Sequence, residues 1–320
     1  MKAKLQSLWK MLKQTAADWS EDNATRLAAA LAYYTVLSVA PLLVLTISVV
    51  GLVFGEDAAR GHIASELGSV VGPQAGEGIQ TVIQHANSPT GGTISSIVSL
   101  VVLLFGASGV FGELQSALNA IWEVKPKPGL GVMGFLRARF FSFTMVLGVA
   151  FLLLVSLVLS AALTAVGRFF EHTLPGGEAV WQVVNTVISF GVITALFALI
   201  FKVVPDVKIT WRDVWMGAAF TALLFTIGKF ALGMYLGRAS VASPYGAAGS
   251  IIVLVIWVYY AAQILFMGAE FTQVYARAHG SQIQPSDHAV PADQPSTPED
   301  KSEPARDEAK RMPPPRAAHT

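Results

Sequence analysis

Long apolar stretches alternate with short polar segments along the first 280 residues of the chain. At a rise of 1.5 Å per residue, an uncharged helical run of about 20 residues crosses the ~30 Å hydrocarbon core of a bilayer. The pattern therefore predicts six transmembrane helices, at about residues 27–55, 94–122, 140–167, 179–201, 214–237 and 248–270. The expected fold class is all-α, a polytopic membrane bundle over residues 27–276.

The distribution of positive charge predicts the orientation of this bundle. Five Lys or Arg residues precede the first span, whereas residues 56–93 carry only Arg60. Residues 123–139 are basic again, and the alternation of rich and poor segments continues to the last loop. Because Lys and Arg are retained on the cytoplasmic side of a membrane, both termini are expected to be cytoplasmic.

Three further segments are expected around the spans. Residues 1–26 predict an amphipathic cytoplasmic helix, which lies either in the membrane interface or packed under the bundle. The first outer loop, residues 56–93, predicts two short helices divided at Gly72 and Pro73. Residues 277–320 predict a disordered, proline-rich tail, because this composition cannot bury enough apolar surface to offset the entropy of ordering.

Composition agrees with a membrane protein and excludes several chemistries. Of the 320 residues, 53% are hydrophobic and 13% are charged, whereas soluble domains carry about 25% charged residues. The chain has no cysteine, which excludes disulfides and thiolate metal sites, and its six histidines are not paired at ligand spacing. The sequence also lacks a phosphate-binding loop motif. We therefore expect no enzyme activity, no metal and no cofactor.

Three polar residues near the end of the second span are candidates for a substrate pathway. Gln115 and Asn119 are four residues apart and share one helix face. Glu113 points about 200° away from Gln115 around the same helix. Amides within a membrane either hold helices together through hydrogen bonds or line a polar path, and the spacing alone is compatible with both.

Lys229 and Glu270 complete the candidate pathway. Lys229 interrupts the fifth span in its outer half, where it either extends to the outer interface or meets an anion inside the bundle. Glu270 ends the sixth span, where the negative end of the helix dipole disfavours a carboxylate, so a cationic partner is expected nearby. The candidate partners on the inner side are Lys202, Lys208, Arg212, Arg137 and Arg139.

Three positions are expected to shape the bundle. Pro41 lies inside the first span and predicts a kink, because proline lacks an amide hydrogen and clashes with the preceding turn. The kink either shapes the bundle or opens a cavity. Gly246 and Gly249 lie at the start of the sixth span, where small residues allow a close helix crossing or leave amides free to bind an anion.

Four stretches carry a resemblance to a known family: "AAALAYYTVLSVAPLL", "GVFGELQSALNAIW", "PDVKITWRDVWMGA" and "SPYGAAGSIIVLVIWVYYAAQILFMGAEFT". In this order, over about residues 20–276, they resemble the YihY/BrkB family of bacterial inner-membrane proteins. The resemblance implies six spans and a bacterial cytoplasmic membrane. It implies no settled activity, since members have carried the name ribonuclease BN and others are linked with serum resistance or with lipid and envelope biology.

The sequence predicts a transporter, or a translocator of lipids or anions, whose pathway is lined by Glu113, Gln115, Asn119, Lys229 and Glu270. Membrane lipids are the expected partners, and an anionic lipid or a small anion would suit Lys229. The alternative is a non-catalytic membrane scaffold in envelope assembly. A ribonuclease is disfavoured, because metal-dependent cleavage needs clustered carboxylates or histidines, so no nucleic-acid partner is expected.

Overall fold

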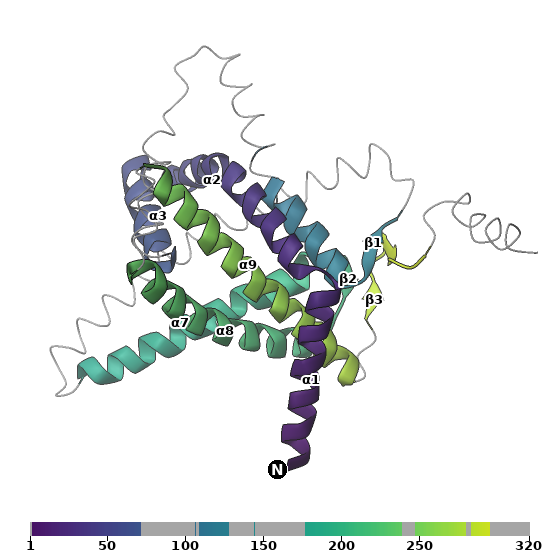
Figure 1. Ribbon diagram of the computed structural model, residues 1–320. Helices are drawn as coiled ribbons and strands as arrows, with labels where there is room; N and C mark the ends of the chain where they lie inside the picture. The colour runs from purple at the N-terminus through teal and green to yellow at the C-terminus, as the bar shows by residue number, and fades with distance from the viewer. Residues whose placement is uncertain are drawn as a thin grey trace, which may run out of the picture.

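The computed structural model describes residues 2–71, 106, 109–127, 144, 177–238, 247–279 and 283–294. Its elements in chain order are α1 (Lys2–Glu21), α2 (Ala24–Phe54), α3 (Glu56–Val71), β1 (Val124–Pro126), α7 (Gly177–Val203), β2 (Val207–Lys208), α8 (Trp211–Arg238), α9 (Ala247–Ala278), β3 (Gln284–Pro285) and β4 (Ala289–Pro291). Residues 109–121 are also helical. Figure 1 shows long helices that cross one another, with the strands gathered at one end.

Four stretches in the described part of the chain are long and apolar enough to cross a membrane: Ala24–Ser48, Thr186–Val203, Trp211–Tyr235 and Ile251–Ala278. They correspond to the first, fourth, fifth and sixth predicted spans. Most of the second and third predicted spans lie outside the described residues, so the count of six stays a prediction. Large apolar side chains such as Val187 on α7 and Phe230 on α8 are exposed, as expected of helices that contact lipid.

Two matched glycine–threonine contacts join α8 to α9. Gly217 of α8 lies against Thr272 of α9, and Thr221 of α8 lies against Gly268 of α9, so closely that a Cβ on either glycine would overlap the threonine side chain. Because the residue numbers rise on one helix as they fall on the other, the two helices are antiparallel. Small residues of this kind let helix backbones approach within a membrane, where van der Waals packing drives association.

α2 packs against α9 and against the helix that contains residues 109–121. At the second contact Gly106 faces Pro41, and a Cβ on this glycine would lie 2.8 Å from the Pro41 Cγ. Gly109 faces Ser38 in a similar way, since a Cβ on Gly109 would lie 3.3 Å from the Ser38 Oγ. Pro41 therefore presents its ring to a neighbouring helix that carries glycine at the contact, while the kink itself stays a prediction.

α1 joins α2 through Asn23, whose φ of 52° places it in the left-handed region. The second half of α1 packs on the bundle, where Thr15 is buried. Trp19 contacts the main core, the apolar cluster that includes Ala28 of α2, Leu118 and Phe266 of α9. The first half extends away from the other helices and exposes Leu8 and Trp9 (Figure 1). A helix thus occupies most of the predicted amphipathic segment, and its location in the membrane interface stays a prediction.

α3 is the first of the two helices predicted in the first outer loop. Its Ala59 and Ile63 pack with residues of α2 and α9, including Leu43 and Val253, in a second apolar core. This core closes the end of the bundle opposite to the strands. The second predicted helix of this loop lies outside the described residues.

Residues 283–294 differ from the expectation of a disordered tail. β4 pairs antiparallel with β1, and β3 pairs antiparallel with β2. Ala289 is buried and Ile283 packs against the main core. The segment cannot form a core alone, but strands from distant parts of the chain supply hydrogen-bond partners for its backbone. We call the end of the bundle formed by the four strands, the start of α2 and the end of α9 the strand-bearing end.

Candidate functional site

A polar clasp, formed by Gln115, Asn119 and Asp206, joins the helix of residues 109–121 to the loop between α7 and α8. Asn119 Nδ2 donates a hydrogen bond to Asp206 Oδ2 at 2.9 Å, and the Asp206 amide donates to Asn119 Oδ1 at 2.8 Å. Gln115 Nε2, one turn earlier, donates to the same carboxylate oxygen at 3.3 Å. Asn119 is buried. Asn119, the buried member of the clasp, therefore both donates and accepts a hydrogen bond, as polar groups in protein interiors require.

The loop that carries Asp206 is held at both of its ends. Lys202, in the last turn of α7, donates from Nζ to the Ile209 carbonyl. Thr210 directly precedes α8, and its hydroxyl donates to Asp213 in the first turn of that helix. This contact ties the residue before α8 to the first turn of that helix. The loop thus holds Asp206 in place for the clasp.

α9 holds the end of the helix of residues 109–121. Gln273 is buried, and its Nε2 donates at 2.8 Å to the Ile121 carbonyl, one of the carbonyls that a helix end leaves without a donor. Glu123 follows with a φ of 53°, a left-handed conformation that leads the chain from the helix into β1. The Glu123 carboxylate forms an ion pair with Arg277 at 2.9 Å.

Glu270 lies one turn before Gln273 and has a different environment. Its side chain is 0% exposed, and neither carboxyl oxygen receives a hydrogen bond from an N–H or O–H donor among the residues that the structure describes. The charged groups that act on it are the carboxyl groups of Asp22 and Asp18 and the guanidinium of Arg277. We call Asp22 and Glu270 the carboxyl pair.

Asp22 lies half-buried in the turn that joins α1 to α2. Burial raises the pKa of the Asp22 carboxyl above its ordinary value, a hydrogen bond with Glu270 lowers this pKa, and the carboxylates of Glu123, Asp18 and Glu21 raise it again. The net direction is upward. The carboxyl pair therefore lies where two negative charges side by side are disfavoured.

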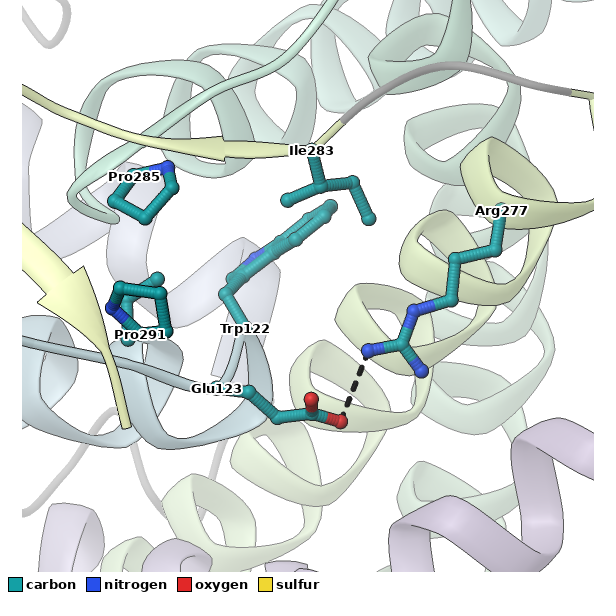
Figure 2. Close-up of a pocket in the computed structure, with 7 residues that line it drawn as sticks. Trp122, Glu123, Arg277, Ile283, Pro285 and Pro291 are labelled. Carbon is teal, nitrogen blue, oxygen red and sulfur yellow. Dashed lines mark hydrogen bonds and ion pairs between the residues drawn. The ribbon is translucent and has the colours of Figure 1, made fainter. Parts of the chain in front are cut away.

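A pocket of about 320 Å³ opens at the strand-bearing end, next to the ion pair of Glu123 and Arg277. Figure 2 shows the Arg277 guanidinium turned toward the Glu123 carboxylate on one side of the pocket. The other lining residues are Trp122, Val124, Ile283, Pro285 and Pro291. Because Arg277 also acts on Glu270, the pocket and the carboxyl pair share one cation.

The structure brings together only part of the predicted pathway. Gln115 and Asn119 meet on Asp206, whereas Glu113 is half-buried on the same helix. Lys229 is exposed on α8, about 27 Å along the helix axis from the first residue of α8. The antiparallel register of α8 and α9 places Lys229 about 15 Å along the axis from the level of Glu270.

The remaining predicted positions have mixed outcomes. Gly249 lies in the first turn of α9, and Gly246 lies outside the described residues. Of the cations suggested for Glu270, Lys202 bonds to a backbone carbonyl and Lys208 pairs with Asp287 at 2.6 Å. Arg137 and Arg139 lie outside the described residues. Within the described ranges, the cation that acts on Glu270 is Arg277, two turns further along α9.

Sequence reasoning missed Asp206, Asp22 and Gln273. Asp206 follows a proline between two predicted spans, on the same predicted side of the membrane as Asn119, and this coincidence was an available signal. Asp22 belongs to the polar turn "SEDN" before the first span and has no comparable signal. Gln273 lies beyond the predicted end of the sixth span, which α9 extends to Ala278.

Long apolar helices with a polar end covered by short strands define the class of the molecule, a multi-pass helical membrane protein. The chain matches the family described as virulence factor BrkB over residues 15–293, and it belongs to this family. The match confirms the resemblance carried by the four sequence stretches, and it includes the strands β3 and β4.

The relatives of the chain are membrane proteins of bacteria. It is 30% identical to the "UPF0761 membrane protein" of Verminephrobacter eiseniae (strain EF01-2) over 270 residues, which are 82% of this chain and 62% of the relative. It is 27% identical to the protein of the same name from Pseudomonas aeruginosa (strain LESB58) over 252 residues, 78% of this chain and 58% of the relative. The chain thus spans about six-tenths of the length of these curated relatives. No solved structure matches the chain.

Proposed function

We propose that this chain is a translocator in the bacterial inner membrane that moves an anionic lipid or a small anion. The observation that carries the proposal is the Glu270 carboxyl, which is fully buried near the end of an apolar helix and receives no hydrogen bond from an N–H or O–H donor in the described part of the chain. Burying such a group without a partner costs free energy. Ionisable residues in membrane helices mark ion or substrate pathways by default.

A translocator needs two conformations that differ in free energy when the substrate or a coupled ion binds. A carboxyl that is unfavourable in one conformation supplies this difference if a second conformation admits water or an ion to it. A scaffold has no such requirement, and a buried carboxyl without a partner would only reduce its stability. This argument favours translocation over a static role.

The proposed orientation places the strand-bearing end in the cytoplasm, with six spans and both termini inside. The basic residues Lys125, Lys127 and Lys208 at this end support the orientation, because positive side chains are retained on the cytoplasmic side. The polar clasp then lies close to the cytoplasmic boundary. Glu113 lies deeper, about 14 Å along the helix axis from Trp122.

A scaffold in envelope assembly is the second candidate function. The observation that favours it is the pocket at the strand-bearing end, where Trp122, Ile283 and two prolines surround an ion pair. Such a surface offers both apolar contact and charge to a protein partner. This function predicts a folded protein without any flux.

Flux through purified protein in liposomes tests the proposal. We expect the wild type either to exchange a fluorescent phosphatidylglycerol between leaflets or to release trapped chloride, and Glu270→Gln to reduce the active process at least tenfold. Asp57→Asn, which neutralises an exposed carboxyl on α3, serves as the matched control and should keep full activity. A folded wild-type protein that moves neither probe would contradict translocation and leave the scaffold.

Two further variants decide whether the predicted pathway residues take part. Glu113→Gln and Lys229→Gln each remove a charge from a span without shortening the side chain greatly. If these side chains line the path, flux falls while the folded fraction is unchanged. If Lys229 extends to lipid headgroups, its variant transports like the wild type.

A further inference from the structure

We propose that the carboxyl pair of Asp22 and Glu270 is a proton-binding site, at which the two side chains hold one proton between them at neutral pH. The site would release this proton when the turn between α1 and α2 moves away from α9. The inference rests on the proposed function only where it names the proton as the ion coupled to translocation. The binding site itself follows from the contacts around the two carboxyl groups.

The first step is the burial of Glu270. Its side chain is 0% exposed, and neither of its oxygens receives a hydrogen bond from an N–H or O–H donor among the residues that the structure describes. An ionised carboxylate would need donors to replace the water it has lost. Gln273, the nearby polar side chain of α9, already donates from Nε2 to the Ile121 carbonyl.

The second step is the position of Asp22, which directly follows α1, a helix that packs on α9. The carboxyl groups of Asp22 and Glu270 act on each other by charge and through a hydrogen bond. Two ionised carboxylates carry acceptors only, so neither can donate to the other. One proton converts this repulsive contact into a hydrogen bond between a carboxylic acid and a carboxylate, which is one of the strong kinds. A single proton therefore satisfies the pair without any other ligand.

The third step is the balance of charge around the pair. Asp18 and Glu21 approach from α1, and Glu123 approaches from the end of the helix of residues 109–121. Arg277 on α9 is the cation that acts on Glu270, and it is shared with Glu123 at 2.9 Å. Among the described residues, negative groups thus outnumber the cation around the pair, which favours retention of a proton.

A route for the proton follows from the difference in exposure within the pair. Glu270 is closed to solvent, whereas Asp22 is half-buried and raised in pKa by burial. A proton from water therefore reaches Asp22 first and Glu270 second. Asp22 directly precedes Asn23, whose left-handed conformation forms the turn between α1 and α2, so a change at this turn would separate the two carboxyl groups.

A proton fits the pair better than a metal ion does. In the described ranges, no group of three or more His, Cys, Asp or Glu side chains is arranged to hold a metal. Calcium takes six to eight oxygen ligands, and magnesium needs near-octahedral geometry. The carboxyl pair provides two side chains, which is enough to share a proton.

Infrared spectroscopy of the purified full chain tests the site directly. We expect a carboxylic-acid C=O band at neutral pH that shifts in D₂O, is lost in Glu270→Gln, and is unchanged in the control Asp57→Asn. In Asp22→Asn the band should persist at a shifted frequency, because Glu270 loses its carboxylate partner. If Glu270→Gln fails to fold, the shift in Asp22→Asn decides the test. A wild-type spectrum without this band, or a band that appears only after sodium is removed, would overturn the proposal.

Flux measurements separate this inference from the proposed function. A band assigned to Glu270 together with an absence of flux would support the proton site and contradict translocation. Flux that continues without the band would support translocation and contradict the proton site. If both hold, an imposed pH gradient should change the flux of the wild type at least tenfold more than that of Glu270→Gln.

Discussion

The polar clasp and the carboxyl pair bury similar groups at the same end of the bundle, but they match them in opposite ways. In the clasp, the amides of Gln115 and Asn119 donate to the Asp206 carboxylate. In the pair, the carboxyl of Glu270 meets another carboxyl, that of Asp22. The clasp is complete as it stands, whereas the pair lacks a donor until a proton is added.

The same contrast occurs within one turn of α9. Gln273 donates to the Ile121 carbonyl and so fixes the end of a neighbouring helix. Glu270, three residues earlier, is equally buried and receives no hydrogen bond from an N–H or O–H donor in the described part of the chain. A satisfied polar group holds a structure together, and an unsatisfied one makes it ready to change when a ligand arrives. The clasp is therefore expected to serve stability and the pair to serve function.

The largest effect is expected when the clasp is broken. Asn119→Leu removes a donor and an acceptor, so the Asp206 amide and carboxylate lose their buried partner and the free energy of unfolding should fall by about 3 kcal/mol. Denaturant titration in detergent, followed by tryptophan fluorescence, measures this change. Ser116→Ala, at an exposed position of the same helix, is the control and should change little. If the free energy of unfolding of Asn119→Leu equals that of the wild type, the distinction between the polar clasp and the carboxyl pair is contradicted.

The carboxyl pair should respond with the opposite sign. Glu270→Gln keeps the shape of the side chain and supplies to Asp22 an amide donor that does not depend on a proton. The free energy of unfolding should therefore be kept at neutral pH, and it should exceed that of the wild type by about 1–2 kcal/mol in alkaline solution, where the pair loses its proton. The same titration measures it. A loss of stability comparable to that of Asn119→Leu would mean that Glu270 is a structural group, and the proposed role in transport would fail with it.

The pH dependence of stability sharpens the comparison further. The pKa of Asp22 in the folded protein is raised above the ordinary value of 3.8. In the pH range between the ordinary pKa and the raised pKa, the folded state therefore binds more protons than the unfolded state. The contribution of Asp22 to stability is therefore greatest in acid and falls as pH rises through its folded pKa. Melting temperatures of the wild type and Asp22→Asn should diverge in favour of the variant as pH rises. Parallel curves would contradict the raised pKa.

The sequence predicted the long elements well because hydrophobic runs of span length leave few alternatives. The first, fourth, fifth and sixth predicted spans correspond to α2, α7, α8 and α9. Apart from the end of α9, their predicted bounds differ from the helix bounds by no more than a few residues. The sixth span was predicted to end at Glu270, eight residues before the end of α9. A charged residue at the end of an apolar run indicates the edge of the membrane when its contacts are unknown. A charged residue marks the end of a span only if it is exposed, and Glu270 is buried.

The candidate site was predictable only where its residues follow helical spacing. Gln115 and Asn119 share a face by their four-residue interval, and they do meet one partner. Asp206 and Asp22 come from turns, whose positions depend on contacts between distant parts of the chain. The strands at residues 283–294 were missed for the same reason, since their partners lie in β1 and β2.

The smallest effect is expected at the exposed ion pair of Lys208 and Asp287, which joins β2 to the turn between β3 and β4 at 2.6 Å. The hydrogen bond from Lys208 lowers the pKa of Asp287, so any stability it provides is present above the ordinary pKa of an aspartate and is lost as pH falls through the lowered value. Both side chains are more than half exposed, and solvent screens such pairs strongly. A double-mutant cycle with Lys208→Gln and Asp287→Asn should give a coupling energy near zero at neutral pH and physiological salt. A coupling as large as the effect of Asn119→Leu would show that satisfaction of polar groups matters at the surface as much as in the interior, and the distinction drawn between the clasp and the pair would then need a cause other than burial.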